Sequence, residues 1–110
     1  MIDWTRVKEL REEVGAEDFG EVVDLFLEEV NDVTERMKAA PDLSNLEADL
    51  HFLKGSALSL GFNDFANLCQ DGETASAQGQ SDDVNVAAIL TSYDASKVVF
   101  LADLPTILAT

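Results

Sequence analysis

The stretch that decides the fold runs from residue 51 to residue 73 and reads HFLKGSALSLGFNDFANLCQDGE. Around its start, apolar residues recur at the spacing of an α-helix: Leu46, Leu50, Leu53, Ala57 and Leu60. A helix with this pattern buries the apolar stripe and leaves its other side for solvent or partners. At about 100° per residue, His51 points roughly 140° away from the centre of that stripe. We therefore expect this histidine, the only one in the chain, to face outward.

The neighbours of His51 on this helix form a small chemical site. Lys54 and Gly55 lie one turn further along, within about 60° of His51. An imidazole is a nucleophile near neutral pH because much of it is uncharged there, and an ammonium group attracts any anion placed on it. Glycine costs a helix about 1 kcal/mol relative to alanine, so Gly55 indicates that something approaches the helix closely at this position.

This pattern resembles the motif of histidine phosphotransfer (HPt) domains, which serve in multistep two-component phosphorelays. The matching residues are His51-x-Leu53-Lys54-Gly55-Ser56, then Gly61, and then Leu68, Cys69 and Glu73 on the following helix. The motif is short, but the helical layout around it fits the family from end to end. Gly72 is a departure, because the family more often has a larger residue there, which leaves the packing at this point open.

The resemblance implies a role for each residue of the site. His51 would be the phosphoacceptor, with Nε2 attacking the aspartyl phosphate of a receiver domain. Lys54 would neutralise the phosphoryl charge, Gly55 would allow close approach of the receiver, and Glu73 or Gln70 would hold the other ring nitrogen. The implied partners are response-regulator receiver domains and a hybrid sensor histidine kinase. We expect no cofactor on this chain, with Mg²⁺ supplied by the receiver, since the sequence offers no carboxylate trio around His51.

Phe52 and Leu58 flank the histidine away from the apolar stripe, and we expect them to form an apolar collar for partner docking. Two alternatives stay open, in which Phe52 packs at the edge of the bundle and Leu58 is half-buried. An alternative function is a helical-bundle adaptor that binds a signalling partner through the same face without carrying phosphate. A kinase or phosphatase is disfavoured because the sequence has no nucleotide-binding motif or metal cluster, so we predict a phosphoryl carrier without enzymatic activity of its own.

The periodicity predicts helices at residues 4–14, 18–39, 44–60, 63–77 and 83–103, and no segment alternates as a strand does. Such helices with short connections pack most simply as an antiparallel up-down-up-down four-helix bundle, with the short N-terminal helix lying over one end. The apolar side of the second helix is the clearest: Phe19, Val22, Val23, Phe26, Leu27, Val30, Val33 and Met37. For the last helix we expect a stripe of Val84, Ala87, Leu90, Tyr93 or Asp94, Lys97, Val98 and Leu101.

Capping residues predict where these helices begin and end. Asp3 is placed to cap the first helix and Gly15 to end it. Ser44 and Glu47 have the spacing of a capping box that would start the histidine helix. The chain should turn at Gly61, with Asn63 capping the next helix, while Pro41 and Pro105 should end the second and last helices.

Composition limits the class of protein. The 110 residues suggest a single domain, 1–110, and a bundle that closes on itself as a monomer. A net charge of −15, from 22 acidic and 7 basic residues, argues against nucleic acid and anionic membranes as partners. It favours basic protein surfaces, or equally a generally solvated surface. The lone Cys69 cannot form an internal disulfide and should be buried, no signal peptide is evident, and a cytoplasmic location follows as the expectation.

Overall fold

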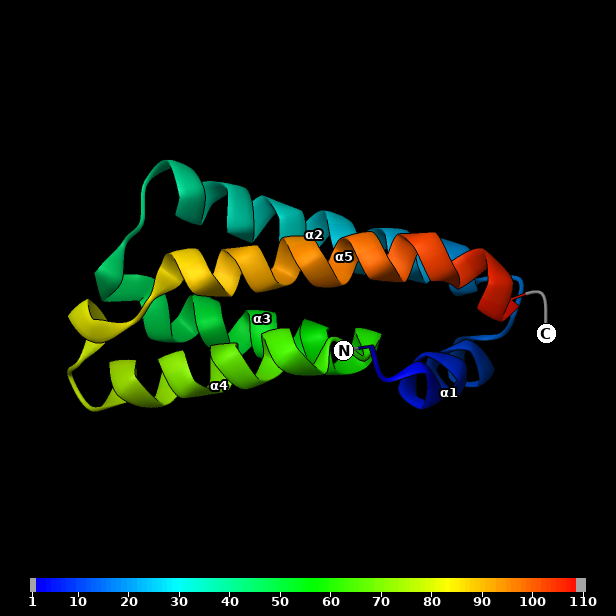
Figure 1. Cartoon of the computed structure of the whole chain (residues 1–110), viewed down its shortest axis with the longest axis horizontal. Helices are drawn as coiled ribbons and strands as arrows, with labels where there is room; N and C mark the ends of the chain where they lie inside the picture. Colours follow the sequence, from blue (N-terminus) through cyan, green and yellow to red (C-terminus); the bar gives the residue numbers. More distant parts are fainter. Residues whose placement is uncertain (1, 109–110) are drawn as a thin grey trace.

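The computed structural model describes residues 2–108, which form helices joined by short turns (Figure 1). The α-helices are α1 (Trp4–Val14), α2 (Phe19–Ala39), α3 (Leu46–Leu60), α4 (Asn63–Ala77) and α5 (Val86–Leu108). Two 3-10 turns, η1 (Leu43–Asn45) and η2 (Ser81–Asp83), precede α3 and α5. Over residues 2–108 the β structure consists of one isolated bridge between Ile2 and Phe62. The all-α fold predicted from the sequence is confirmed.

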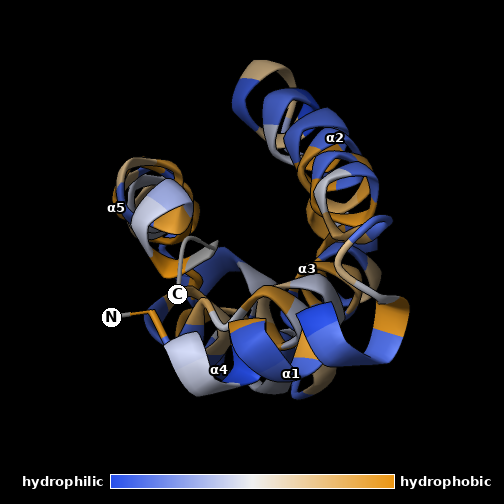
Figure 2. Ribbon diagram, turned by 90° about the vertical axis from the view of Figure 1, so that its right-hand side faces the viewer, coloured by the Kyte–Doolittle hydropathy of each residue, from blue (hydrophilic) through white to orange (hydrophobic). Residues whose placement is uncertain are grey.

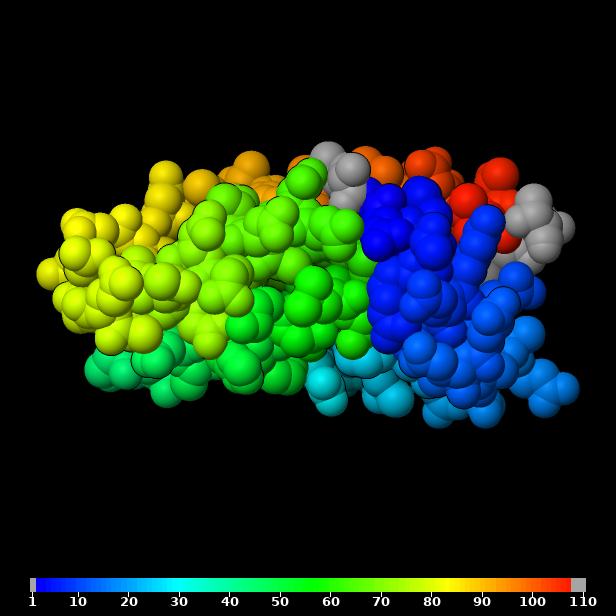
Figure 3. Space-filling view, turned by 90° about the horizontal axis from the view of Figure 1, so that it is seen from below, coloured from blue at the N-terminus to red at the C-terminus, as the bar shows by residue number. Residues whose placement is uncertain are grey.

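Helices α2 to α5 run alternately up and down and form the predicted antiparallel bundle (Figure 1). With 15 residues each, α3 and α4 span about 22 Å at 1.5 Å per residue. With 21 and 23 residues, α2 and α5 are longer by about 10 Å or more. The short helix α1 lies beside the end of α3 and α4, beneath the extra length of α2 and α5 (Figures 1 and 3).

The buried side of α3 is the one that the spacing predicts. Leu50 and Leu53 have no exposed surface, and the rest of the stripe is at most 3% exposed. In α2 the residues at i, i+3 and i+4 spacing also turn inward, and its outer face is hydrophilic (Figure 2). Phe62 completes the core, with its ring centroid 5.2 Å from that of Phe100 and 6.2 Å from that of Tyr93. Burial of this apolar surface is the main force that holds the helices together.

Gly61 ends the histidine helix α3 and links it to the start of α4 and to Asp3, the residue before α1. Its φ of 75° lies in the left-handed region, which lets the Phe62 N–H reach back 2.8 Å to the Ala57 carbonyl and close the end of α3. The Gly61 carbonyl accepts a hydrogen bond of 2.8 Å from the Asp3 N–H, and a Cβ at Gly61 would lie 2.5 Å from the Asp3 carbonyl oxygen. Asp3 also caps α1 by accepting from the Arg6 N–H at 3.2 Å, as predicted.

The predicted Ser44 and Glu47 capping box is wrong, and α3 begins at Leu46 rather than at Ser44. Asp42 takes the capping role one turn earlier. Its Oδ1 accepts from the Ser44 N–H at 3.0 Å and from the Ser44 hydroxyl at 2.6 Å, which holds residues 43–45 in the 3-10 turn η1. The Ser44 hydroxyl is therefore used as a donor to Asp42, and α3 begins without a side-chain cap hydrogen bond.

Asn63 is also not a cap, because it is the first residue of α4 and Phe62 occupies the cap position without a side-chain hydrogen bond. The left-handed turn at Gly61 directs the Phe62 ring into the core, where it is fully buried. Burial of an aromatic ring at this position outweighs the loss of one capping hydrogen bond of about 1 kcal/mol.

The last helix differs most from the prediction. It begins at Val86, after Asn85 accepts from the Ala88 N–H at 3.0 Å, and it continues through Pro105 to Leu108. Pro105 removes one backbone hydrogen bond only three residues before the helix ends, and Leu104 packs against the core.

The predicted stripe for this helix is only partly right, because Leu90 and Tyr93 are buried and Val84 packs against the core, but the other predicted positions are not buried. Ala87 is exposed, Val98 and Leu101 are 68% and 48% exposed, and the buried residues are Ile89, Leu90, Tyr93, Ser96 and Phe100. Within α5 only Asp94, Lys97 and Asp103 are charged, so its sequence is apolar almost all round and several stripes fit the spacing. Of the two alternatives given for the fourth position, Tyr93 is buried and Asp94 is exposed.

Gly72 resolves the packing that the sequence left open. It is buried in α4, and a Cβ built on it would lie 2.6 Å from Leu50 Cδ1 and 3.2 Å from Val84 Cγ1. The Leu50 side chain therefore occupies the space that a larger residue would take, and α3 and α4 approach closely at this level.

We predict that Gly72→Ala lowers stability although alanine favours helix. The helix-propensity gain of about 1 kcal/mol is opposed by overpacking against the fully buried Leu50, which typically costs about 1–3 kcal/mol. Urea unfolding followed by circular dichroism measures the net loss. Gly55→Ala is the matched control, because nothing lies within 4 Å of its Cβ position and its stability should rise. A Gly72→Ala variant as stable as the control would contradict the close-packing argument.

Candidate functional site

His51 projects from α3 on the side opposite the buried stripe, and its side chain is 69% exposed. The outward direction predicted from the helical spacing is confirmed. The ring is anchored on one side only. Its Nδ1 lies 2.9 Å from Oε2 of Glu73, which is contributed by α4. An ionised carboxylate only accepts hydrogen bonds, so Nδ1 carries the proton and the lone pair of a neutral ring is on the outward Nε2.

Glu73 connects the ring to Lys54. The Lys54 Nζ lies 2.8 Å from the second carboxylate oxygen, Oε1, and donates a hydrogen bond of 2.9 Å to Gln70 Oε1. Hydrogen bonding from Lys54, and then from His51, lowers the pKa of Glu73 despite its partial burial. The carboxylate therefore stays ionised between two nitrogen groups, which holds the site in a defined arrangement.

Of the two residues predicted to hold the ring nitrogen, Glu73 makes the contact. Gln70 accepts from Lys54 instead, and its own Nε2 donates to Thr74 Oγ1 at 3.0 Å. Gln70 thus contacts the ammonium rather than the imidazole.

Gly55 lies exposed one turn after His51, and a Cβ placed on it would meet nothing within 4 Å. Among residues 2–108 no contact explains a glycine at this position, in contrast to Gly72. Phe52 and Leu58 are 39% and 51% exposed, so both present apolar surface near the histidine. The histidine helix therefore presents two apolar side chains beside the polar site and, at Gly55, a position without a side chain.

A comparison with protein-family models matches residues 21–98 of the chain to the Hpt domain. The chain belongs to the Hpt domain family. Hpt domains are phosphocarriers rather than kinases, and in phosphorelays they interact with receiver domains and kinases. The family therefore gives the chain a general phosphotransfer role. No curated protein and no solved structure matches the chain significantly.

The candidate site has neighbours that sequence reasoning missed. A shallow hollow of about 530 Å³ beside the ring is lined by Ser44, Glu47, Ala48, His51 and Glu73. Ala48 and Glu47 precede His51 by three and four residues, so helical spacing alone could have identified them.

Asp49 was missed as well. It is 6% exposed and accepts two hydrogen bonds, of 2.8 and 3.1 Å, from the Arg36 guanidinium, and a third from Asn45 at 3.1 Å. This ion pair ties the end of α2 to the start of the histidine helix. No spacing rule connects residues on two different helices, so sequence reasoning had no signal for this ion pair.

Other chemistry is limited in the part of the chain that the structure describes. Cys69 is buried, as expected, and burial raises the pKa of its thiol to about 12. Between residues 2 and 108 no group of three or more His, Cys, Asp and Glu side chains is arranged to hold a metal ion. Over the same residues no helix is both long enough and apolar enough to span a membrane.

The Glu73 contacts predict a pH-dependent stability. Because the folded-state pKa of Glu73 lies below its ordinary value of 4.5, its contribution is present above that value and is lost as the pH falls through the lowered pKa. Wild type should therefore be more stable than Glu73→Gln at neutral pH, and the difference should shrink as the pH falls below 4.5 and through the lowered pKa. Urea unfolding at a series of pH values measures it. In a Lys54→Gln background the effect should be smaller, and an unchanged pH dependence there would contradict the assigned cause.

Proposed function

We propose that His51 accepts a phosphoryl group from the aspartyl phosphate of one receiver domain and passes it to the aspartate of another. The observation that carries the proposal is the one-sided anchoring of the ring. Nδ1 contacts a carboxylate at 2.9 Å while the side chain is 69% exposed, so Nε2 faces the direction from which a partner arrives. An uncharged, oriented and accessible nitrogen is what a nucleophile in phosphoryl transfer requires.

In this step the Nε2 lone pair forms a bond to phosphorus as the bond between phosphorus and the aspartyl oxygen breaks. The aspartate leaves as a carboxylate, and the ring becomes a phosphoimidazolium that keeps its proton on Nδ1. Glu73 offsets the new positive charge on the ring through its contact with that N–H. Transfer to a second aspartate is the reverse, and neither direction requires a proton to leave the ring.

Lys54 supplies the positive charge next to the phosphorylated ring. Its ammonium is held by Glu73 and Gln70, within the same helix turn as the ring, and a phosphoryl group on Nε2 adds negative oxygens in its vicinity. An ammonium stabilises such charge most where solvent is partly excluded, and the Lys54 side chain is only 21% exposed. Mg²⁺ would come from the receiver, which supplies the carboxylates that the described residues around His51 do not gather.

Gly55, Phe52 and Leu58 would form the surface on which the receiver docks. The two apolar side chains exclude water around the reacting atoms, and the glycine lets the partner's backbone come close to the helix. Partners of this kind would be a hybrid sensor histidine kinase and a response regulator, each meeting a monomer of this chain in turn through one face.

The central experiment mixes a radiolabelled phosphorylated receiver with the protein. We expect one phosphoryl group on wild type and none on His51→Gln, with both proteins equally helical by circular dichroism. Label on the variant would rule out His51 as the acceptor. If wild type binds the receiver but takes no label, the chain is an adaptor that uses this face without carrying phosphate.

Gly55→Leu should slow phosphoryl transfer while the bundle stays folded. A rate lower by roughly tenfold corresponds to a loss of about 1.4 kcal/mol of docking free energy. Gly20→Leu is the control, because Gly20 is also an exposed helical glycine with nothing within 4 Å of its Cβ position. Equal transfer rates in the two leucine variants would count against a special role for Gly55.

A further inference from the structure

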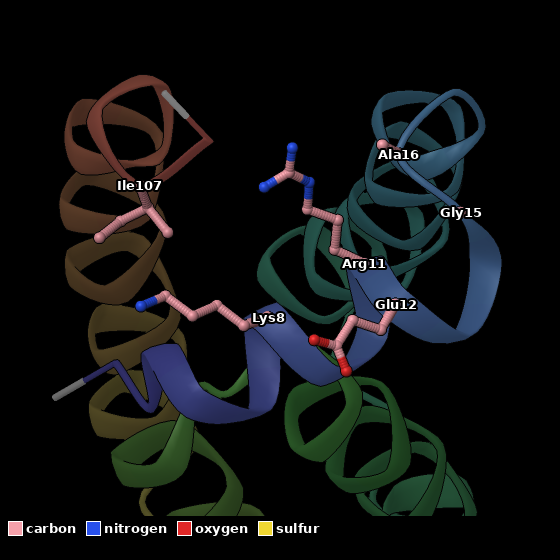
Figure 4. Close-up of a pocket in the computed structure, with 6 residues that line it drawn as sticks. All are labelled: Lys8, Arg11, Glu12, Gly15, Ala16 and Ile107. Carbon is pink, nitrogen blue, oxygen red and sulfur yellow. The ribbon is translucent and has the colours of Figure 1, made fainter. Parts of the chain in front are cut away.

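A pocket of about 480 Å³ lies at the end of the bundle where α1 meets the last turns of α5. Its lining consists of Lys8, Arg11, Glu12, Gly15, Ala16 and Ile107, drawn in Figure 4. His51 belongs to the half of α3 that starts from the opposite end of the molecule (Figure 1). The proposed phosphotransfer site and this pocket therefore share no residue.

Lys8 and Arg11 differ from every other cation of the chain. Within residues 2–108 neither side chain forms an ion pair or a hydrogen bond, although the chain has 22 acidic residues. The other five basic side chains each contact a polar partner. Arg6 pairs with Glu9 and Glu13, Arg36 with Asp49, Lys38 with Glu35 and Asp94, and Lys54 with Glu73, while Lys97 donates to Asn31. The two cations without a partner line the same pocket.

Figure 4 shows how these side chains lie. The Lys8 side chain extends toward α5 near Ile107, and the Arg11 guanidinium points into the space between α5 and the turn that joins α1 to α2. The Glu12 carboxylate points in another direction, away from the guanidinium. Two positive groups and one apolar side chain are thus presented together, while the neighbouring acid does not neutralise them.

The residues that line the pocket limit which class of anionic ligand fits it. No aromatic side chain lines the pocket, so a nucleotide base would find no stacking surface, and the volume is much larger than a single phosphate or carboxylate group needs. Lys8 and Arg11 are three residues apart on one helix and so lie on one face. In an extended peptide, side chains two residues apart also share one face, at a spacing of about 7 Å. Two such carboxylates match two long, flexible cations.

We propose that this pocket, the Lys8–Arg11 pocket, binds a short acidic peptide segment of a partner protein. Alternate carboxylates of the segment contact Lys8 and Arg11, and an apolar side chain of the segment packs on Ile107. The chain as a whole has a net charge of −15, so its surface elsewhere repels an acidic segment, which favours binding at this pocket. More distant acidic groups are screened at about 0.1 M salt, where the Debye length is about 10 Å.

The test measures fluorescence anisotropy of a labelled peptide at about 0.1 M salt, with glutamates two residues apart, a leucine two residues further on, and serines between them, so that both carboxylates and the leucine share one face. We expect Lys8→Gln and Arg11→Gln each to weaken binding by roughly two- to fivefold, as expected for exposed ion pairs, and the double variant to weaken it further. Glu12→Gln should leave binding unchanged or tighten it. Lys38→Gln, which makes the same charge change on an exposed residue of α2, is the matched control and should bind like wild type.

Four results would overturn the proposal. They are no binding of the glutamate peptide to wild type, equal binding of a glutamine and leucine peptide, an equal loss in Lys38→Gln, and complete displacement of the peptide by an equal concentration of inorganic phosphate. The last result would identify a simple oxyanion site instead. Because the assay measures binding alone, its outcome is independent of whether His51 carries phosphate.

Discussion

The close approach of α3 and α4 at Leu50 and Gly72 is the constraint on which the site depends. Leu50 immediately precedes His51, and Gly72 immediately precedes Glu73. Leu50 packs into the space that a side chain at Gly72 would fill, which brings α3 and α4 close together. As a result, the next residue of each helix places His51 Nδ1 and Glu73 Oε2 2.9 Å apart on the surface. A larger residue at position 72 would separate the helices at the point where the carboxylate has to reach the ring. The geometry of the site is in this sense a consequence of core packing.

The same arrangement explains why one carboxylate can serve two nitrogen groups. Glu73 offers one oxygen to His51 and the other to Lys54, and both contacts favour its ionised form, which lowers its pKa. Its negative charge orients the imidazole and limits the net positive charge of the resting site. In the proposed transfer, a phosphoryl group at Nε2 would bring its own negative charge, which the ammonium, already held nearby by Gln70, would balance. The site is preorganised on two rigid helices rather than on a loop.

How much could be predicted from the sequence depended on whether the relevant contact lies along one helix or between two. The buried stripe of α3 and the outward direction of His51 follow from spacing on a single helix, and both were predicted. The choice between Glu73 and Gln70 depends on how α4 is rotated against α3, which no single-helix pattern fixes. Asp49 with Arg36 was missed for the same reason. In α5 the pattern itself was ambiguous, since apolar residues lie on several sides of the helix, and the aromatic packing of Tyr93 and Phe100 on Phe62 selected the buried face.

The distribution of charge bears on how partners meet this protein. The few basic residues act mostly within the chain: Arg36 holds the start of α3, Lys97 joins α5 to Asn31 of α2, and Lys54 completes the site. The surplus negative charge is therefore left on the outer faces, such as the hydrophilic side of α2 (Figure 2). A partner that carries an acyl phosphate brings further negative charge toward this surface, so favourable encounter requires basic groups on the partner around that phosphate. Electrostatic attraction between the acidic chain and a basic surface would then select the partner. The apolar collar of Phe52 and Leu58, together with Gly55, would determine how closely the docked partner approaches His51.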